Sequence, residues 1–205
     1  YKRCSISSAL NLPKFTLGLR FYVTSMTPPM PCKPTGSKSK FKAQKDLDTK
    51  GITMSTVNKE NVQQQVGVQL APTPWHTVTQ EQINQFADCT LDHQFIHISP
   101  EAAAKTPFGG TIAHGFLTLS MLSHFSENFG FVIEGAYMGV NYGFDSVRFI
   151  APVKVGKHIR AHAKILEVVE KKPGQFMSKT EVVIEIEGEE KPALKAIWIG
   201  MQMVK

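Results

Sequence analysis

The spacing of hydrophobic positions changes near residue 137 and divides the organised part of the chain into two portions. Between residues 79 and 129, apolar residues recur three and four positions apart, which is typical of helices that bury one face. Beyond residue 137 they alternate with polar residues, which is typical of strands. We therefore expect helices followed by a sheet, an α+β architecture.

Two short helices are predicted in the first portion. Thr79-Gln80-Glu81-Gln82 is a capping box, in which the Thr hydroxyl and the Gln side chain satisfy backbone N–H groups, so a helix is expected from residue 79 to about residue 88. Ser99 followed by Pro100 predicts the start of a second helix. Residues 89–98 between them are predicted to form a loop that is rich in polar side chains.

A third helix is predicted over residues 111–129. Apolar residues surround almost its whole circumference, so we expect this helix to be buried. Four strands are expected after it, over residues 137–150, 158–170, 181–187 and 197–203, with a hairpin turn at Lys171-Lys172-Pro173-Gly174. Strands in series after one buried helix predict an antiparallel sheet wrapped around that helix.

The basic charge is confined to the N-terminal segment. The 205 residues carry a net charge of +6, but residues 1–50 hold ten basic and two acidic residues, and the remainder holds 13 basic and 15 acidic residues. The basic surplus therefore gives no reason to expect that a folded domain binds nucleic acid. We expect a basic arm over residues 1–53 and one domain over residues 54–205.

The arm over residues 1–53 and the cysteine content indicate in which cellular compartment the protein is expected. Residues 11–22 mix apolar and basic residues without acids, as organellar transit segments do. A natural disordered arm would have the same composition, and so would sequence upstream of the true start, since Met26 and Met54 are both internal. No apolar run approaches the roughly 20 residues that span a bilayer. The three cysteines lack a CxxC pair, which argues against a disulfide framework or structural zinc. We expect a cytoplasmic protein without membrane contact, or a mitochondrial-matrix protein if the arm is a transit segment.

Candidate chemistry is concentrated around residues 92–115. Asp92 and His97 lie in the polar loop, and His114-Gly115 opens the buried helix. A carboxylate and an imidazole facing one cleft can hold a water and exchange protons with it, and a helix N-terminus stabilises developing negative charge. The alternative is that Asp92 caps a turn and His97 is a hydrogen-bonded structural residue.

A metal site is the competing interpretation of the same residues. His93 and His97 are four residues apart and His114 offers a third imidazole. However, Gln94 occupies the place where a zinc protease has its general-base glutamate, and the spacing has no special meaning on a loop. We expect neither a metal nor a cofactor.

Three stretches together resemble the MaoC-like dehydratases, which include R-specific enoyl-CoA hydratases and the nodulation protein N-like proteins. The stretches are Asp92-x-Gln94-Phe95-Ile96-His97, Phe108-Gly109-Gly110-Thr111-Ile112-Ala113-His114-Gly115, and residues 143–156 with Val147-Arg148-Phe149 and Pro152-Val153. The resemblance covers residues 75–205. It implies a hot-dog fold, in which an antiparallel sheet wraps a long central helix, in agreement with the pattern of the strands.

The resemblance also implies roles for individual residues. Asp92 and His97 would be catalytic, with the Gly115 N–H as an oxyanion donor and Ser123 as a further active-site group, although a helix hydroxyl bonded to its own turn explains Ser123 equally well. A second set would bind substrate: Gln94, Phe108, Gly110, Ile112 and His114.

The motif departs from the family at two places. Gln94-Phe95 replaces the Asn-Pro of most hydratases and looks more like the nodulation protein N-like branch. Leu91 replaces a glycine, which raises the question of whether the loop keeps a glycine-specific backbone conformation.

The implied activity is hydration of a trans-2-enoyl thioester to an R-3-hydroxyacyl thioester, or the reverse dehydration. The substrate would be an acyl-CoA or an acyl-carrier-protein thioester, the protein a homodimer, and Arg148, Lys154 and Lys157 candidates for contacting CoA phosphates. A hot-dog acyl-CoA thioesterase and a non-catalytic acyl-thioester-binding protein are the alternatives.

Overall fold

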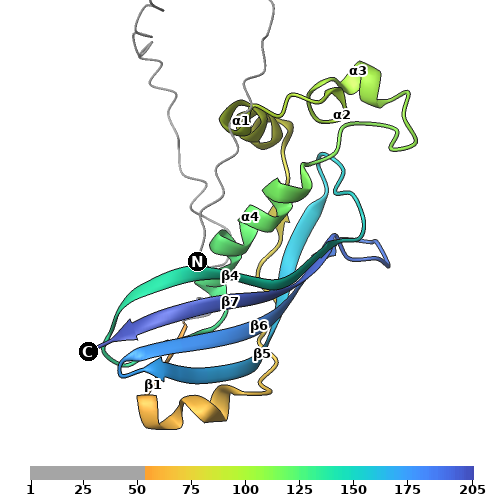
Figure 1. The fold of residues 1–205 in the computed structure, drawn as a ribbon. Helices are drawn as coiled ribbons and strands as arrows, with labels where there is room; N and C mark the ends of the chain where they lie inside the picture. The colour runs from red at the N-terminus through yellow and green to blue at the C-terminus, as the bar shows by residue number, and fades with distance from the viewer. Residues whose placement is uncertain (1–53) are drawn as a thin grey trace, which may run out of the picture. The chain divides into compact units, whose positions relative to one another are not determined.

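A curled five-stranded sheet forms the body of the molecule (Figure 1). The computed structural model describes residues 54–205, so the arm predicted over residues 1–53 lies outside the described residues. The strands follow the order β2-β5-β6-β7-β4, and every neighbouring pair is antiparallel. Their bounds are β2 His76–Thr77, β4 Ala136–Phe149, β5 His158–Lys172, β6 Gln175–Ile186 and β7 Leu194–Val204. The four predicted strands are present, and β6 begins six residues earlier than its alternating pattern indicated.

The hairpin between β5 and β6 explains this earlier start. Gly174 has a φ of +74°, and a Cβ at this position would lie 2.4 Å from the Val204 carbonyl oxygen. Only glycine fits so close an approach, and the tight turn lets pairing resume at once, with Lys172 opposite Gln175.

Helix α4, Gly115–Phe125, packs on the inner face of the sheet. Leu122 and Phe125 are each 1% exposed and contact a core that includes Ala161, Val182 and Ile184 from the strands. The small alanines of β5 leave room for the helix, so the expected wrapping of sheet around helix is confirmed.

The predicted bounds and full burial of this helix were wrong. Residues 111–114 are extended instead, because the Ala113 N–H donates to the Val153 carbonyl at 2.8 Å and Ile112 pairs with Lys154. At the other end, a 3-10 turn, η2 Ser126–Asn128, follows α4. Phe116 is 68% exposed, so one face of α4 is uncovered in the protomer.

Helix α1, Gln80–Thr90, begins where the capping box predicted. The Thr79 hydroxyl accepts a hydrogen bond from the Gln82 N–H at 3.2 Å. The Gln82 side chain does not close the box; it contacts His76 and the Met121 sulfur of α4, each at 3.2 Å. The Gln82 half of the predicted capping box therefore links α1 to the core instead of capping the helix.

Two one-turn helices complete the helical portion, α2 Phe95–Ile98 and α3 Pro100–Ala103. Helix α2 occupies part of the segment predicted as loop. Ser99 is the N-cap of α3 and Pro100 its first residue, as predicted, but the Ser99 side chain makes no capping hydrogen bond.

A small second layer was not anticipated. Strand β1, Ser55–Val57, pairs in parallel with β3, Phe131–Ile133, and the 3-10 helix η1 spans Lys59–Gln65. Val57, Val62 and Ile133 form a second apolar cluster with residues of β5 and β6. Three-residue strands carry too little alternation to be recognised from sequence.

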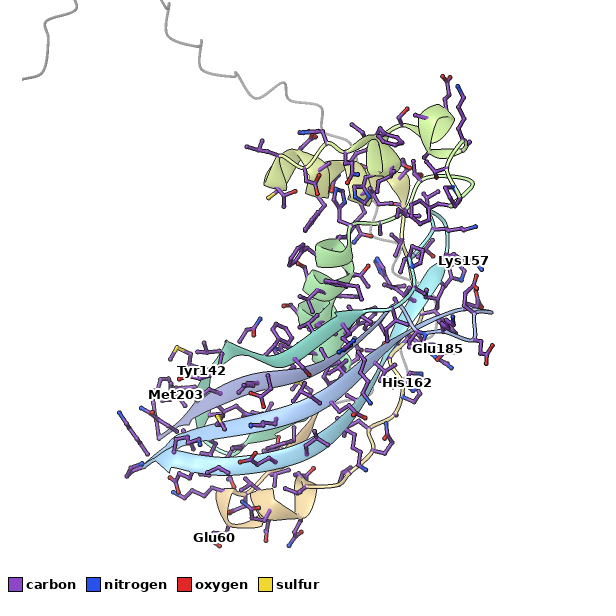
Figure 2. All side chains as sticks on the ribbon, turned by 45° about the vertical axis from the view of Figure 1, so that its right-hand side comes forward. Glu60, Tyr142, Lys157, His162, Glu185 and Met203 are labelled. Carbon is purple, nitrogen blue, oxygen red and sulfur yellow. The ribbon has the colours of Figure 1, made fainter. Side chains whose placement is uncertain are left out.

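The outer face of the sheet, opposite α4, is charged (Figure 2). Glu185 of β6 accepts hydrogen bonds from Arg160 at 2.7 Å and from His162 at 2.5 Å, both on β5. The Arg160 guanidinium also lies 4.2 Å from the centre of the Trp75 ring. None of the helices within residues 54–205 is long and apolar enough to cross a membrane.

Candidate active site

Asp92, His97 and His114 come together although they belong to three different elements. Asp92 lies in the turn after α1, His97 in α2, and His114 at the N-cap of α4. One carboxylate oxygen and one ring nitrogen from each histidine all lie within 4.8 Å of one another. A single water between the carboxylate and an imidazole would fit this separation, since each hydrogen bond spans about 2.8 Å.

His97 is held by the backbone just before α4. Its ring is 7% exposed, and Nδ1 donates to the Ile112 carbonyl oxygen at 2.7 Å. This bond assigns the proton to Nδ1 and leaves Nε2 as a free acceptor. Burial is the main cause that lowers the pKa of His97. The hydrogen bond to Ile112 opposes this shift, and smaller contributions come from His114, which lowers the pKa, and from Asp92, which raises it. His97 is therefore neutral near pH 7 and able to accept a proton.

His114 contacts both residues of this pair. Its ring is 3% exposed and stacks on His97, with ring centres 3.7 Å apart, and its Nε2 donates to the Asp92 carbonyl oxygen at 3.0 Å. Phe86 of α1 covers it at 5.1 Å. Its Nδ1 has no hydrogen-bond partner among residues 54–205. The sequence proposed His114 as a substrate-binding residue, and the geometry gives it contacts with Asp92 and His97.

Leu91 sets the direction of the chain into Asp92. Its φ of 62° and ψ of 20° are left-handed, and it is the only non-glycine residue with positive φ in the described part of the chain. A leucine thus adopts the left-handed conformation that favours glycine, at a cost of about 1–2 kcal/mol. The side chain is 81% exposed and contributes no core packing that would offset this cost.

Gln80 ties the site together and was not identified from sequence. Its Nε2 donates to the His97 carbonyl oxygen at 2.7 Å, and its Oε1 accepts from the Thr111 hydroxyl at 2.5 Å. One side chain of α1 thus holds both α2 and the strand that leads into α4. In the sequence Gln80 was visible only as a member of the capping box.

The N-terminus of α4 is open. His114 caps it without a side-chain hydrogen bond, so the first N–H groups, including that of Gly115, are not taken by a capping group. The Phe149 ring lies 3.1 Å from the place where a Gly115 Cβ would be. Glycine therefore avoids a tight contact with this ring, and the helix presents its positive end next to the histidine pair.

The remaining candidate substrate-binding residues lie around this cluster. Gln94 is the N-cap of α2 and makes no capping bond, while Phe108 and Gly110 lie in the segment between α3 and Thr111. Ile112 is buried and acts through its backbone: its N–H donates to the Ile96 carbonyl and its carbonyl holds His97.

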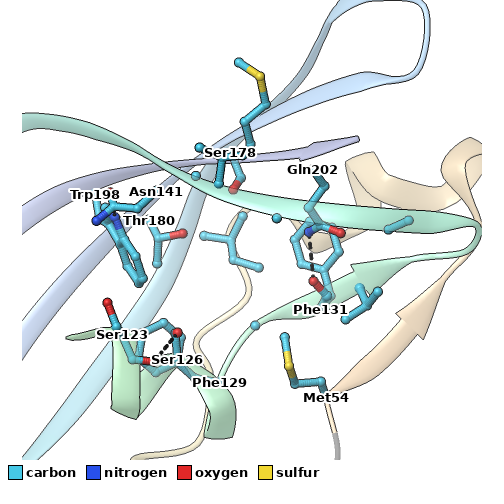
Figure 3. Close-up of a pocket in the computed structure, with 18 of the residues that line it drawn as sticks. Met54, Ser123, Ser126, Phe129, Phe131, Asn141, Ser178, Thr180, Trp198 and Gln202 are labelled. Atoms are coloured by element: carbon cyan, nitrogen blue, oxygen red, sulfur yellow. Dashed lines mark hydrogen bonds between the residues drawn. The ribbon is translucent and has the colours of Figure 1, made fainter. Parts of the chain in front are cut away.

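Ser123 lies apart from the histidine pair. It is eight residues beyond Gly115, which corresponds to about 12 Å along the helix axis. It lines a cavity of about 530 Å³ between the C-terminal half of α4 and the inner face of the sheet (Figure 3). Phe129, Met138 and Trp198 also line the cavity, whereas Asp92 and His97 do not.

The donor set does not favour a metal. His114 Nε2 donates to the Asp92 carbonyl, which fixes this ring by one nitrogen and leaves the Asp92 carboxylate, His97 Nε2 and the buried His114 Nδ1 as the uncommitted donor atoms, none of them from a cysteine. A catalytic zinc needs three protein ligands and a structural zinc four. The cluster is better suited to acid–base chemistry on a water.

Of the three basic residues considered for CoA phosphates, Lys157 is engaged with Glu189 at 2.9 Å. Arg148 and Lys154 are exposed, and the backbone of Lys154 pairs with Ile112, the residue whose carbonyl holds His97.

Comparison with known proteins places these features among characterised relatives. A family model described as "MaoC like domain" matches residues 61–188. Nodulation protein N of Rhizobium leguminosarum bv. viciae is 46% identical over 147 residues, which are 71% of this chain and 91% of the relative. The 3-hydroxyacyl-thioester dehydratase Z of Mycobacterium tuberculosis is 42% identical over 130 residues, or 63% of this chain and 85% of that protein.

Solved structures agree on the fold. The (R)-hydratase from A. caviae involved in PHA biosynthesis superposes with a TM-score of 0.55 at 24% identity, covering 66% of this chain and 94% of that one. The monoamine oxidase regulatory protein from Archaeoglobus fulgius gives a TM-score of 0.62 at 24% identity, covering 75% and 99%. The predicted hot-dog fold is confirmed.

Proposed function

Because the chain belongs to the family of MaoC-like domains, we propose that it hydrates trans-2-enoyl-CoA to R-3-hydroxyacyl-CoA or catalyses the reverse dehydration. One observation carries the proposal: a neutral His97 and the Asp92 carboxylate face each other within 4.8 Å, next to the uncapped N-terminus of α4. This arrangement combines a base, a second proton carrier and an oxyanion-binding helix end.

In this reaction His97 and Asp92 hold the water. His97 Nε2 takes one proton as the water oxygen forms its bond to C3 of the substrate. His97 passes this proton to the Asp92 carboxylate, and Asp92 delivers it on the same face to C2, where the electron pair of the C2–C3 double bond forms the new C–H bond. The water thus provides both the hydroxyl and the hydrogen that are added, and the two side chains return to their starting states.

The start of α4 stabilises the charge that develops on the thioester oxygen. The Gly115 N–H would donate to this oxygen as the enolate-like transition state forms. One well-placed donor of this kind contributes about 2.7–4 kcal/mol. His114 fixes the positions of Asp92 and His97 relative to this donor, because it contacts both residues and its backbone continues directly into Gly115.

The test measures hydration of crotonyl-CoA by the variants Asp92→Asn and His97→Ala, with the loss of the enoyl absorbance as the readout. Each variant should lose at least about 100-fold in kcat/KM, because proton transfer by a positioned side chain contributes about 10²–10⁴-fold. Asp88→Asn is the matched control, since Asp88 is a nearby exposed aspartate that pairs with His93 at 2.9 Å.

Circular dichroism should show folded protein for all three variants. Retained hydration in Asp92→Asn or His97→Ala would overturn the assignment. Release of free thiol without hydration would identify a thioesterase instead.

We also propose that two copies pair along β4. This strand is an edge of the sheet, and it exposes large apolar side chains, among them Tyr137 at 61% and Tyr142 at 63%. The uncovered Phe116 of α4 lies against Phe149 at the end of the same strand, with ring centres 5.7 Å apart. An unpaired apolar edge is normally covered, and a second β4 would continue the sheet.

Sedimentation should give a dimer for the wild type and a monomer for Tyr142→Lys. The control is Val66→Lys, which should remain dimeric. Val66 is 40% exposed and directly follows η1, away from β4. A wild-type monomer at micromolar concentration would contradict the pairing.

A further inference from the structure

The cavity beside α4 contains two kinds of polar side chain. Asn141, Gln202 and Ser126 are engaged: Asn141 accepts from the Trp198 indole at 2.7 Å, Gln202 bonds the backbone of β3, and the Ser126 hydroxyl donates to the Ser123 carbonyl at 2.8 Å. These groups need no ligand. They form part of the wall.

Three hydroxyls in the same cavity are free. Ser123, Ser178 and Thr180 line it, and their hydroxyls form no hydrogen bond with any other residue in the range 54–205. They are open to the cavity and not sealed in protein, because the only fully buried unpaired polar side-chain atom in that range belongs to His114.

The free hydroxyls come from facing elements. Ser178 and Thr180 lie two residues apart on β6 and therefore point to the same inner face, and Ser123 approaches from α4 (Figure 3). Gly200, opposite Ser178 on β7, carries no side chain, and a Cβ there would lie 3.5 Å from the Ser178 hydroxyl. Glycine at this position keeps that hydroxyl accessible.

These groups lie at a defined distance from the reacting carbonyl. The Gly115 N–H marks the thioester oxygen in the proposed reaction, and Ser123 is about 12 Å farther along α4. The surrounding wall is apolar, with Phe129, Met138 and Trp198. An acyl chain that extends about 12 Å from Gly115 along α4 would bring its far end to Ser123 and the cavity.

A plain alkyl tail would fit such a cavity poorly. It would displace water from three hydroxyls without replacing the hydrogen bonds, and each unsatisfied group costs about 1–3 kcal/mol. A tail that carries its own hydroxyl or keto oxygen would replace the water. Sites built around hydrogen bonds to a substrate oxygen reject the analogue that lacks it.

We propose that this cavity selects acyl thioesters whose tail carries a hydroxyl or keto group near its distal end, recognised by Thr180 and Ser178 of β6 and Ser123 of α4. The proposal rests on the proposed hydration, because that reaction places the thioester at Gly115. It adds a substrate class, the distally oxygenated medium-chain acyl group.

The experiment compares two thioesters of equal length, trans-2-decenoyl-CoA and its 10-hydroxy derivative, with the full 205-residue chain. The wild type should show at least about a tenfold higher kcat/KM for the hydroxylated thioester. Thr180→Val, which keeps the shape and removes the hydroxyl, should reduce this preference to within about threefold, and Ser178→Ala should act in the same direction. Ser126→Ala, whose hydroxyl is already engaged, should leave the ratio unchanged.

Equal kcat/KM for the two thioesters in the active wild type would overturn the proposal, as would an unchanged ratio in both Thr180→Val and Ser178→Ala. If neither thioester is hydrated, the proposed function fails, and the cavity is judged by calorimetric binding of decanoate and 10-hydroxydecanoate. Tighter binding of the hydroxy acid, lost in Thr180→Val, would support the cavity assignment alone. Equal binding would refute it.

Discussion

The cluster around His97 and the cavity around Thr180 differ in whether their polar side chains are hydrogen-bonded within the protein. At the cluster, His97 and His114 each have one ring nitrogen committed to a backbone carbonyl, so the orientation of both rings beside Asp92 is fixed. In the cavity, three hydroxyls remain uncommitted. The difference separates a preorganised reacting end from an adaptable end, since fixed groups favour a transition state and free groups favour selection among ligands.

Removing His114 should break the preorganised end most severely. His114→Ala deletes both the stack on His97 and the hydrogen bond to Asp92, and should lower kcat on crotonyl-CoA by about 100-fold. His114→Phe keeps a stacking ring without the N–H and should lose about tenfold. Stopped-flow and steady-state assays separate kcat from KM, and a change confined to KM in both variants would assign His114 to substrate binding instead.

Gly115→Ala should disturb the oxyanion end more mildly. The new Cβ would meet the Phe149 ring at 3.1 Å, so either this ring or the start of α4 must shift by a few tenths of an ångström. We expect about a tenfold loss of kcat/KM, with partial recovery in Gly115→Ala combined with Phe149→Leu, which removes the obstructing ring. If the double variant is no better than the single one, the contact with Phe149 is not the cause.

The pH dependence of kcat/KM tests the proton assignment at His97. The base must be neutral, so activity should be full above its pKa and fall as the pH decreases through it. Because burial lowers the pKa of His97 from 6.5, the acid limb should have its midpoint below pH 6.5. In His114→Phe, where the opposing charge is absent, the midpoint should move upward, and a midpoint above 6.5 in the wild type would contradict the neutral base.

Leu91→Gly measures what the turn before Asp92 costs. Glycine relieves about 1–2 kcal/mol of left-handed strain and loses about 0.5–1 kcal/mol through the greater freedom of the unfolded chain. Urea denaturation should therefore show a gain of about 0.5–1 kcal/mol, with crotonyl-CoA hydration unchanged. A loss of stability would show that the exposed leucine makes a contact that stabilises the fold.

The smallest expected effect is that of replacing Glu185, which lies outside both the His97 cluster and the cavity and serves as a reference for stability. The Arg160 hydrogen bond, and next that of His162, lowers the pKa of Glu185 below 4.5, although burial opposes this. A lowered carboxyl pKa stabilises the fold above pH 4.5, and the contribution is lost as the pH falls through the folded value. Glu185→Gln should cost under about 1 kcal/mol at pH 7, and the cost should diminish as the pH falls below 4.5, measured by thermal unfolding.

The sequence predicted features that depend on neighbours along the chain. The Thr79 cap, the Ser99-Pro100 start and the four strands follow local spacing, and each is present. The start of α4 failed because the Ala113 N–H finds the Val153 carbonyl, 40 residues away, in preference to a helical partner. A tertiary hydrogen bond of this kind has no local signal.

The site shows the same division. Asp92, His97 and Gly115 carried a recognisable motif, whereas the clamp made by Gln80 depends on the approach of α1 to α2 and to Thr111. Likewise, Ser123 lies at the predicted spacing from Gly115, but its environment is set by Ser178 and Thr180, more than 50 residues later. The candidate reactive groups can therefore be named from sequence, while the residues that support them and the cavity beside α4 are visible only in the fold.

The pairing of β4 has a consequence for how the chain reaches its fold. Asp92 and His114 are 22 residues apart, so the reactive end can assemble early from nearby segments. Strand β4 pairs only with β7, with Phe149 opposite Leu194 and Ala136 opposite Val204, across intervals of about 45 to 70 residues. Contacts of such separation form slowly, because the loop must close before they contribute. During synthesis the backbone of β4 stays unpaired until β7 has emerged, which makes this strand a segment where chaperone binding or aggregation would begin.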